Sequence, residues 1–292
     1  MEDSTVAPMP AVAPAGRVPP HAFFLVSAVF HYLGPACAVL LFAAIAPLGV
    51  AWLRIAGAAI VFALWRRPWG YFGGLAAAER RRVVMLGIVL AAMNAAFYLA
   101  IDRLPLGTVG AIEFLGPIGL AASGMRTRRN FAALGLAVAG VYLLTELRIA
   151  GEPVGYVLAF INCGLFVLYV VLGHRIASAG GMAGVDRLGA AMLVAMVAAL
   201  PIGIGDALPA FTDPLLLAAA FGVGIASSVI PYVCDQLAMA RLDRASFALL
   251  LALLPGTASA VGIIVLRQVP SPAEIAGILL VIAGVALHRG AG

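Results

Sequence analysis

Long apolar runs divide the sequence, and the short segments between them carry most of its arginines. A run of about 20 apolar residues is what one helix needs to cross the hydrocarbon core of a bilayer. With only 11% charged residues, the chain cannot cover the surface of a soluble domain, where about 25% is usual. The sequence therefore predicts an all-α membrane protein with ten transmembrane helices. The expected spans are 22–42, 47–65, 83–101, 106–123, 131–145, 155–173, 188–205, 214–238, 245–266 and 273–288.

The segment before the first span is rich in Pro and Ala. We expect residues 1–21 to form a disordered cytosolic tail. A signal peptide is the alternative, since Arg17 precedes an apolar run, but the run 22–42 is longer than a signal core of roughly 7–15 residues.

The arginines indicate the orientation. With the N-terminus inside, 14 arginines fall on the cytosolic side, and 3 (Arg103, Arg148 and Arg267) fall outside. Arg54 lies within a span. Basic residues are enriched in cytoplasmic loops, so we expect an inner-membrane protein with both termini in the cytoplasm. The net charge of +5 is therefore interpreted as an orientation signal, and no nucleic-acid partner is expected.

Two stretches of the chain resemble each other. Residues 97–117 align with 235–255 at an offset of 138, and Ala139-Gly140-Val141 matches Ala283-Gly284-Val285 at an offset of 144. Chance similarity among Leu- and Ala-rich helices is the alternative. The alignment predicts two five-helix halves, 22–145 and 155–288. An odd number of spans inverts the second half, and inverted repeats are typical of secondary transporters with a site near the midplane.

Polar residues inside the spans are the candidate site. Arg54, Glu113 and Asn162 each lie seven residues from the outer end of their spans, which corresponds to a depth of about 10 Å. Charges at this depth usually face a cavity or a partner. Arg54 and Glu113 are interpreted either as a cavity-facing ion pair that contacts a solute or exchanges a proton, or as a structural pair that holds two helices together.

The other candidates lie near the same level or on neighbouring spans. His31 is either a proton carrier or a neutral histidine hydrogen-bonded within the bundle. Asn94 and Tyr98 share one helix face and either line a cavity or bridge helices. Tyr232 is a further candidate.

Other residues are interpreted as packing. Cys37, Cys163 and Cys234 lie in apolar runs and are expected to be buried thiols. Gly135-x-x-x-Ala139 is expected to let two helices approach closely. The spacing of His, Cys and acidic residues predicts no metal site, no cofactor and no catalytic cluster.

Three stretches resemble the EamA-type exporters of the drug/metabolite transporter superfamily, and within them the threonine/homoserine exporter group. They are PLGVAWLRIAGAAIVFAL, NAAFYLAIDRLPLGTVGAIEFLGP and SSVIPYVCDQLAMARLDRASFALL. The resemblance covers nearly the whole chain after residue 21 and implies export of amino acids or related small metabolites. The chain departs from the family at Leu254 and at Leu266-Arg267, where such exporters often carry an acidic residue.

The sequence as a whole predicts a secondary transporter, not an enzyme. Its expected partners are a small-molecule substrate and the lipid bilayer, while proton coupling and a homodimer are left open. A membrane-embedded enzyme is one alternative, although no catalytic cluster is evident. A non-transporting interaction protein is the other, although a scaffold has no need of intramembrane charges such as Arg54 and Glu113.

Overall fold

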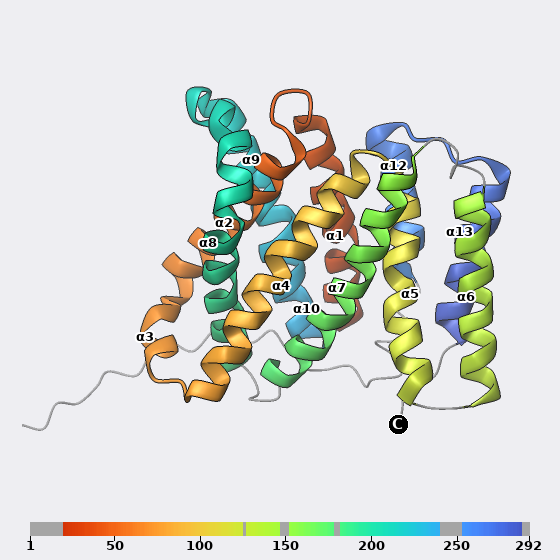
Figure 1. The fold of residues 1–292 in the computed structure, drawn as a ribbon, viewed down its shortest axis with the longest axis horizontal. Helices are drawn as coiled ribbons and strands as arrows, with labels where there is room; N and C mark the ends of the chain where they lie inside the picture. Colours follow the sequence, from red (N-terminus) through yellow and green to blue (C-terminus); the bar gives the residue numbers. More distant parts are fainter. Residues whose placement is uncertain (1–19, 125–126, 147–151, 178–181, 240–252, 288–292) are drawn as a thin grey trace, which may run out of the picture.

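The computed structural model describes residues 20–124, 127–146, 152–177, 182–239 and 253–287. Every regular element in these ranges is a helix (Figure 1). The helices are α1 (Pro20–Leu41), α2 (Pro47–Arg66), α3 (Pro68–Gly73), α4 (Ala77–Ile101), α5 (Leu106–Gly124), α6 (Arg128–Glu146), α7 (Pro153–Ala177), α8 (Met182–Thr212), α9 (Pro214–Gly224), the π-helical turn η2 (Ile225–Val229), α10 (Ile230–Met239), α12 (Leu253–Leu266) and α13 (Pro272–Leu287).

Five of the described helical stretches are long and apolar enough to cross a membrane: Pro47–Arg66, Ala77–Ile101, Pro153–Gly173, Ala183–Thr212 and Pro214–Cys234. Shorter apolar helices cover Leu25–Leu41, Leu106–Gly116, Leu254–Leu266 and Pro272–Gly284. The prediction of an all-helical protein rich in apolar spans is thus confirmed for the described residues. Most of the expected tail 1–21 and the first part of the ninth span, 245–252, lie outside them.

Several helix starts, such as those of α2, α5 and α9, agree with the expected spans, and prolines and caps define a number of them. Pro47 and Pro214 stand in the first turns of α2 and α9, where the missing N–H costs nothing. The carboxylate of Asp213 caps α9 by accepting from two backbone N–H groups, at 2.9 and 3.2 Å. Ser271 and Glu274 form a capping box at the start of α13, with bonds of 2.7 and 3.2 Å.

The seventh span, expected at 188–205, is longer in the structure, because α8 extends over Met182–Thr212. Its first turns are polar and were therefore missed by an apolar window. They are held by ion pairs: Asp186 with Arg66 of α2 at 2.7 Å, and Arg187 with Glu79 of α4 at 2.8 Å.

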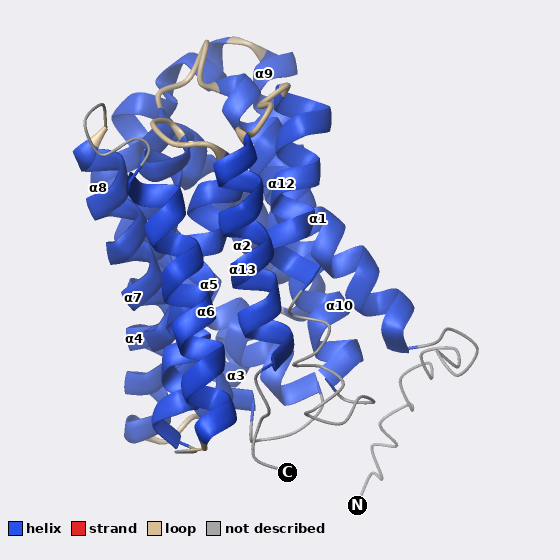
Figure 2. Cartoon of the chain, turned by 90° about the vertical axis from the view of Figure 1, so that its right-hand side faces the viewer, coloured by secondary structure: helices blue, strands red, loops and turns tan. Residues whose placement is uncertain are grey.

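The helices lie in three groups side by side (Figures 1 and 2). The pair α6 and α13 forms one side of the bundle, and α2, α8 and α9 form the other, with α1, α4, α5, α7, α10 and α12 between them. Three of the central helices, α1, α5 and α12, pack together because α12 contacts both of the others.

The α6–α13 contact uses small residues, but not the predicted ones. Gly135 and Ala139 are exposed, and nothing lies within 4 Å of a Cβ placed at Gly135. The buried face is instead formed by Ala133, Ala137 and Gly140. A Cβ at Gly140 would lie 2.5 Å from the backbone oxygen of Gly277. The Gly135-x-x-x-Ala139 prediction was therefore wrong in its register.

Candidate functional site

A buried cavity of about 90 Å³ lies at the centre of the bundle. We call it the central cavity. Seven helices contribute to it, namely α1, α2, α4, α5, α7, α10 and α12. Its lining residues are Ser27, His31, Pro35, Arg54, Met93, Asn94, Phe97, Glu113, Phe114, Asn162, Phe166, Tyr169, Tyr232 and Leu254. Six of the seven predicted site residues belong to this set, so the structure brings them together from six helices.

Arg54 is the cation of the central cavity and is 7% exposed. Its Nε donates to Oγ of Ser228 at 3.1 Å, Nη2 donates to the backbone oxygen of Ser227 at 2.8 Å, and Nη1 donates to Oδ1 of Asn94. A guanidinium has five N–H donors, and these bonds use three of them. The guanidinium carbon also lies 5.6 Å from the centroid of the Tyr98 ring, within the range of a cation–π contact.

The carbonyl that Arg54 binds lacks its usual α-helical partner because of a proline. In a regular helix the backbone oxygen of Ser227 would accept from residue 231, but Pro231 has no N–H. The chain forms a π-helical turn over Ile225–Val229 at this point, a feature often found at functional sites. The sequence analysis missed Ser227 and Ser228, although two serines four and three residues before a proline were a readable signal.

Glu113 carries the carboxylate of the central cavity and is 4% exposed. Asn162 on α7 donates from Nδ2 to Oε1 of Glu113 at 3.1 Å. The second carboxylate oxygen of Glu113 and the amide oxygen of Asn162 are buried without a hydrogen-bond partner. Such orphan acceptors are rare in folded proteins, and here both belong to side chains that line one cavity.

Arg54 and Glu113 form no direct ion pair. Arg54 bonds to residues of α4 and the π-helical turn, whereas Glu113 bonds to α7. Neither version of the predicted pair is therefore present, because these two side chains face the same cavity through separate partners. Among the described residues, neither of these two side chains has an oppositely charged group within 4 Å.

The remaining predicted residues take different places. Asn94 both lines the cavity and bridges α4 to α2, since its Nδ2 donates to the backbone oxygen of Leu90 at 2.8 Å while Oδ1 holds Arg54. Tyr98 does not line the cavity and lies behind Arg54 instead. His31 lines the cavity and packs edge-on against Tyr32, with ring centroids 5.3 Å apart.

One wall of the central cavity is aromatic, which the sequence analysis did not foresee. Phe114 and Phe166 have centroids 6.1 Å apart, Phe166 stacks on Tyr169 at 5.8 Å, and Tyr169 lies 6.2 Å from Tyr232. Asn162, Phe166 and Tyr169 occupy positions i, i+4 and i+7 of α7. That spacing places them on one helix face, which was the available signal.

Comparison with known proteins relates nearly the whole chain to exporters. The threonine/homoserine exporter RhtA of Escherichia coli (strain K12) is 29% identical over 257 residues, which are 86% of this chain and 84% of the exporter. RhtA of Salmonella typhimurium (strain LT2) is 28% identical over 256 residues, with the same coverage. No protein-family model matches the chain.

One solved protein crystal structure shares the fold. It superposes with a TM-score of 0.56 at 20% sequence identity and covers 91% of this chain and 97% of its own. The resemblance to threonine/homoserine exporters carried by the sequence motifs is confirmed by these curated relatives. The chain is accordingly a multi-pass membrane protein homologous to the threonine/homoserine exporter RhtA.

Proposed function

We propose that this protein is a secondary transporter that exports an amino acid or a related metabolite across the inner membrane. Its relatives are exporters of threonine and homoserine by name. The central cavity is the binding site of this proposal, and the seven residues Arg54, Glu113, His31, Asn94, Tyr98, Asn162 and Tyr232 bind the substrate or support the groups that do.

The observation that carries the proposal is a set of unused hydrogen-bonding groups around one cavity. Three of the five N–H donors of Arg54 bond to Ser228, Ser227 and Asn94, while among the described residues Oε2 of Glu113 and Oδ1 of Asn162 have no donor. An α-amino acid presents the complementary groups, because its carboxylate accepts and its ammonium donates. The carboxylate would bind Arg54, and the ammonium would bind Glu113 and Asn162.

Charge supports the same assignment. A charged side chain at mid-bilayer costs about 2.5–3.5 kcal/mol on insertion scales, and the central cavity holds two charges that do not neutralise each other directly. A zwitterion bound between Arg54 and Glu113 would give each of them an opposite charge. A neutral or singly charged solute would leave at least one unmatched.

The aromatic wall would receive the side chain of the substrate. Phe114, Phe166, Tyr169 and Tyr232 offer apolar ring faces from three helices. A cavity of about 90 Å³ favours small side chains. These features suit threonine-sized amino acids better than aromatic ones.

The proposed architecture is ten spans in two inverted five-helix halves, 22–145 and 155–288. The first half contains α1, α2, α4, α5 and α6, and the second contains α7, α8, α9 with α10, α12 and α13. Equivalent helices pair across the halves in α2 with α8, α5 with α12, and α6 with α13. The contact of α1 with α10 has its counterpart in that of α4 with α7. This pattern is unchanged when the halves are exchanged, as a two-fold axis requires.

Two glycines at equivalent positions support the repeat in atomic detail. Gly140 packs against Gly277 and Val281 of α13, and Gly284 packs against Ala133 and Ala137 of α6. Gly140 and Gly284 are also the pair that the sequence alignment matched. The two contacts are thus reciprocal.

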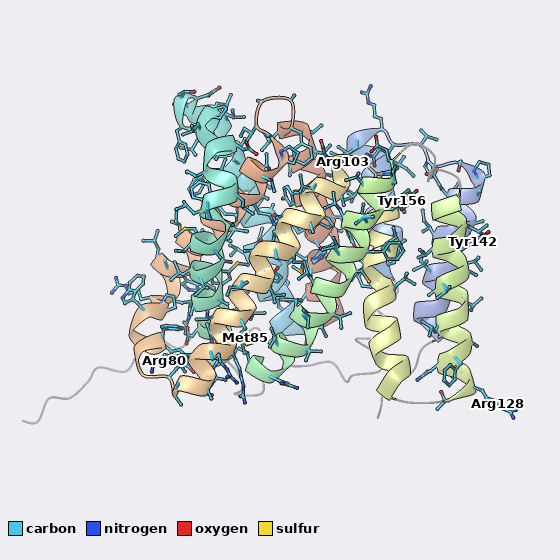
Figure 3. All side chains as sticks on the ribbon, viewed as in Figure 1. Arg80, Met85, Arg103, Arg128, Tyr142 and Tyr156 are labelled. Atoms are coloured by element: carbon cyan, nitrogen blue, oxygen red, sulfur yellow. The ribbon has the colours of Figure 1, made fainter. Side chains whose placement is uncertain are left out.

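The proposed orientation places both termini in the cytoplasm. Among the described residues, nine arginines lie at one end of the bundle and two, Arg103 and Arg267, lie at the other. Figure 3 shows Arg80 and Arg128 at the first end and Arg103 at the second. Because basic residues favour the cytoplasmic side, the first end would face the cytoplasm.

Flux measurements test the proposal directly. Liposomes that contain the purified protein and are loaded with radiolabelled threonine or homoserine should release either amino acid faster than protein-free liposomes loaded in the same way. Arg54→Ala should abolish this release, and Arg67→Ala, an exposed arginine at the end of the same helix, should preserve it. A wild-type protein that moves neither amino acid, nor any other zwitterionic amino acid, would refute the proposal.

A further inference from the structure

A second cavity lies near the end of the bundle where α4 turns into α5 and α12 turns into α13. We call it the outer cavity. Its volume is about 330 Å³, and its lining includes Asp102, Arg103, Ser259 and Gln268. Asp102 and Arg103 form an ion pair at 3.3 Å and are about one third exposed. The outer cavity therefore has a polar lining that lies close to solvent.

The two cavities share walls. Helix α5 contributes Thr108 to the outer cavity and Glu113 to the central one, and α12 contributes Ser259 and Leu254 in the same way. Helix α1 lines both as well. Five residues along a helix correspond to about 7.5 Å, so a short barrier on these three helices separates the cavities.

The side chain of Tyr32 on α1 lies in this barrier between the two cavities. A Cβ placed at Gly110 would lie 3.1 Å from Oη of Tyr32 and 3.0 Å from Cβ of Ala258. Gly110 lies between the two cavity-lining segments of α5, and Ala258 lies between those of α12. The ring reaches its place only because these two positions carry no larger side chain. Tyr32 is fully buried there.

Within the part of the chain that the structure describes, the hydroxyl of Tyr32 has no hydrogen-bond partner. A buried polar group without a partner is destabilising. No hydrogen bond therefore fixes the ring between Gly110 and Ala258, and its hydroxyl would gain a water partner once the two cavities joined. This arrangement suits a side chain that closes a passage and moves.

We propose that Tyr32 is the barrier between the central cavity and the outer cavity, and that the outer cavity is the chamber through which an amino acid leaves the protein. The inference rests on the proposed function, since it assigns the release side of that transport route. It adds a residue and a cavity that the predicted site does not contain.

Thiol labelling tests the barrier without any substrate. The background carries Ser at positions 37, 163 and 234, which removes the native cysteines. One reporter, Met93→Cys, lies in the central cavity, and another, Val39→Cys, lies in the outer cavity. A membrane-impermeant thiol reagent is added to the side that the outer cavity faces.

We expect Val39→Cys to react quickly in every variant. Met93→Cys should react slowly with Tyr32 present, slowly in Tyr32→Phe, and more than about tenfold faster in Tyr32→Ala, which corresponds to a barrier lowered by about 1.4 kcal/mol. Tyr32→Leu, a milder change, should give an intermediate rate and serves if Tyr32→Ala does not fold. Tyr32→Phe should also slow amino-acid flux severalfold, because the open state loses its bond to water.

Two outcomes would overturn the inference. Fast labelling of Met93→Cys with Tyr32 intact would mean that no barrier exists there. Slow labelling in both Tyr32→Ala and Tyr32→Leu, with Val39→Cys still reactive, would place the barrier elsewhere. If the labelling follows the expected pattern but no amino acid is transported, the proposed function fails and the barrier stands.

Discussion

Asn162 on α7 donates from its amide nitrogen to Oε1 of Glu113 on α5, and the two atoms are 3.1 Å apart. The other carboxylate oxygen of Glu113, Oε2, has no donor among the described residues. The bond between Asn162 and Glu113 also joins the first half of the chain to the second at the level of the cavity. Much of the chemistry proposed for the site depends on this one contact.

Replacing Asn162 by Leu should weaken substrate binding. The substrate ammonium would lose one acceptor, and Glu113 would lose the only donor that it has among the described residues. A hydrogen bond to a charged group contributes about 1.5–3 kcal/mol, so the KM for threonine efflux should rise about 10- to 100-fold. Asn130→Leu is the matched control, since Asn130 is equally buried but lies on α6 outside the cavity. An unchanged KM in Asn162→Leu would remove Asn162 from the site.

Removing both Arg54 and Glu113 should not restore stability. In a direct buried pair, losing both charges is less harmful than losing one. Here each side chain has its own partners, so the double variant Arg54→Ala/Glu113→Gln should melt below either single variant in detergent. Arg66 and Asp186, which do form an ion pair at 2.7 Å, provide the contrast. The double variant that removes both Arg66 and Asp186 should have a melting temperature no lower than that of the less stable single variant. A rescued melting temperature for Arg54 and Glu113 would show that they are coupled.

Changing Gly140 or Gly284 to Leu should disrupt the contact between α6 and α13. Each Cβ would lie 2.5–2.6 Å from a backbone oxygen of the other helix. Overpacking of this kind typically costs about 1–3 kcal/mol, and the two substitutions should lower the melting temperature by similar amounts because the contacts are reciprocal. Gly135→Leu, on the open face of α6, should have little effect. A larger loss in Gly135→Leu than in Gly140→Leu would contradict the observed register.

The helix starts could be predicted because prolines and polar caps are local signals. Span 47–65 and helix α2 share their first residue for this reason. The polar first turns of α8 could not be predicted from hydropathy, since Asp186 and Arg187 are held by residues of α2 and α4 that are distant in sequence. The short helix α3 was missed too, because it depends on the left-handed backbone of Arg67, with φ of 46°.

The polar residues of the site could be predicted, because they stand out in apolar runs. The apolar residues that line it could not, because helix packing alone brings them to the cavity. Arg54, Glu113 and Asn162 are conspicuous in apolar runs, and their equal depth anticipated a shared cavity. What depth cannot give is the rotation of each helix about its axis. That rotation decides that Tyr98 lies behind Arg54 and that Leu254 lines the cavity. In the sequence alone, nothing distinguishes Phe114 and Phe166 from lipid-facing or core residues.

Reporter fusions should place both termini in the cytoplasm. A reporter active only in the periplasm should be silent when fused after Arg289 and active when inserted beside Asp102, because the proposed orientation turns the arginine-rich end of the bundle inward. A cytosol-active reporter at the same two positions should give the opposite result. Activity of the periplasmic reporter after Arg289 would reverse the proposed orientation.

The energy source is the last prediction, and it concerns Glu113. This is the buried carboxylate that lines the central cavity, and Leu254 on the opposite half offers no second one. A bound ammonium would match the charge of Glu113. Once the solute leaves, that charge is no longer matched, because the nearest donor is the neutral amide of Asn162. Proton uptake at Glu113 would then replace the solute and allow export in exchange for a proton.

We therefore expect net efflux from wild-type proteoliposomes to follow an imposed pH gradient. In Glu113→Gln, the response to the gradient should disappear while exchange of solute for solute survives, since a neutral amide cannot take up the proton. The measurements are net efflux and counterflow of radiolabelled threonine across a pH series. If Glu113→Gln still follows the gradient, the proton is carried elsewhere, and His31→Gln, which alters the histidine that lines the same cavity, becomes the variant to measure. A wild type that ignores the gradient would be a facilitator, and Glu113 would then serve to bind the substrate ammonium alone.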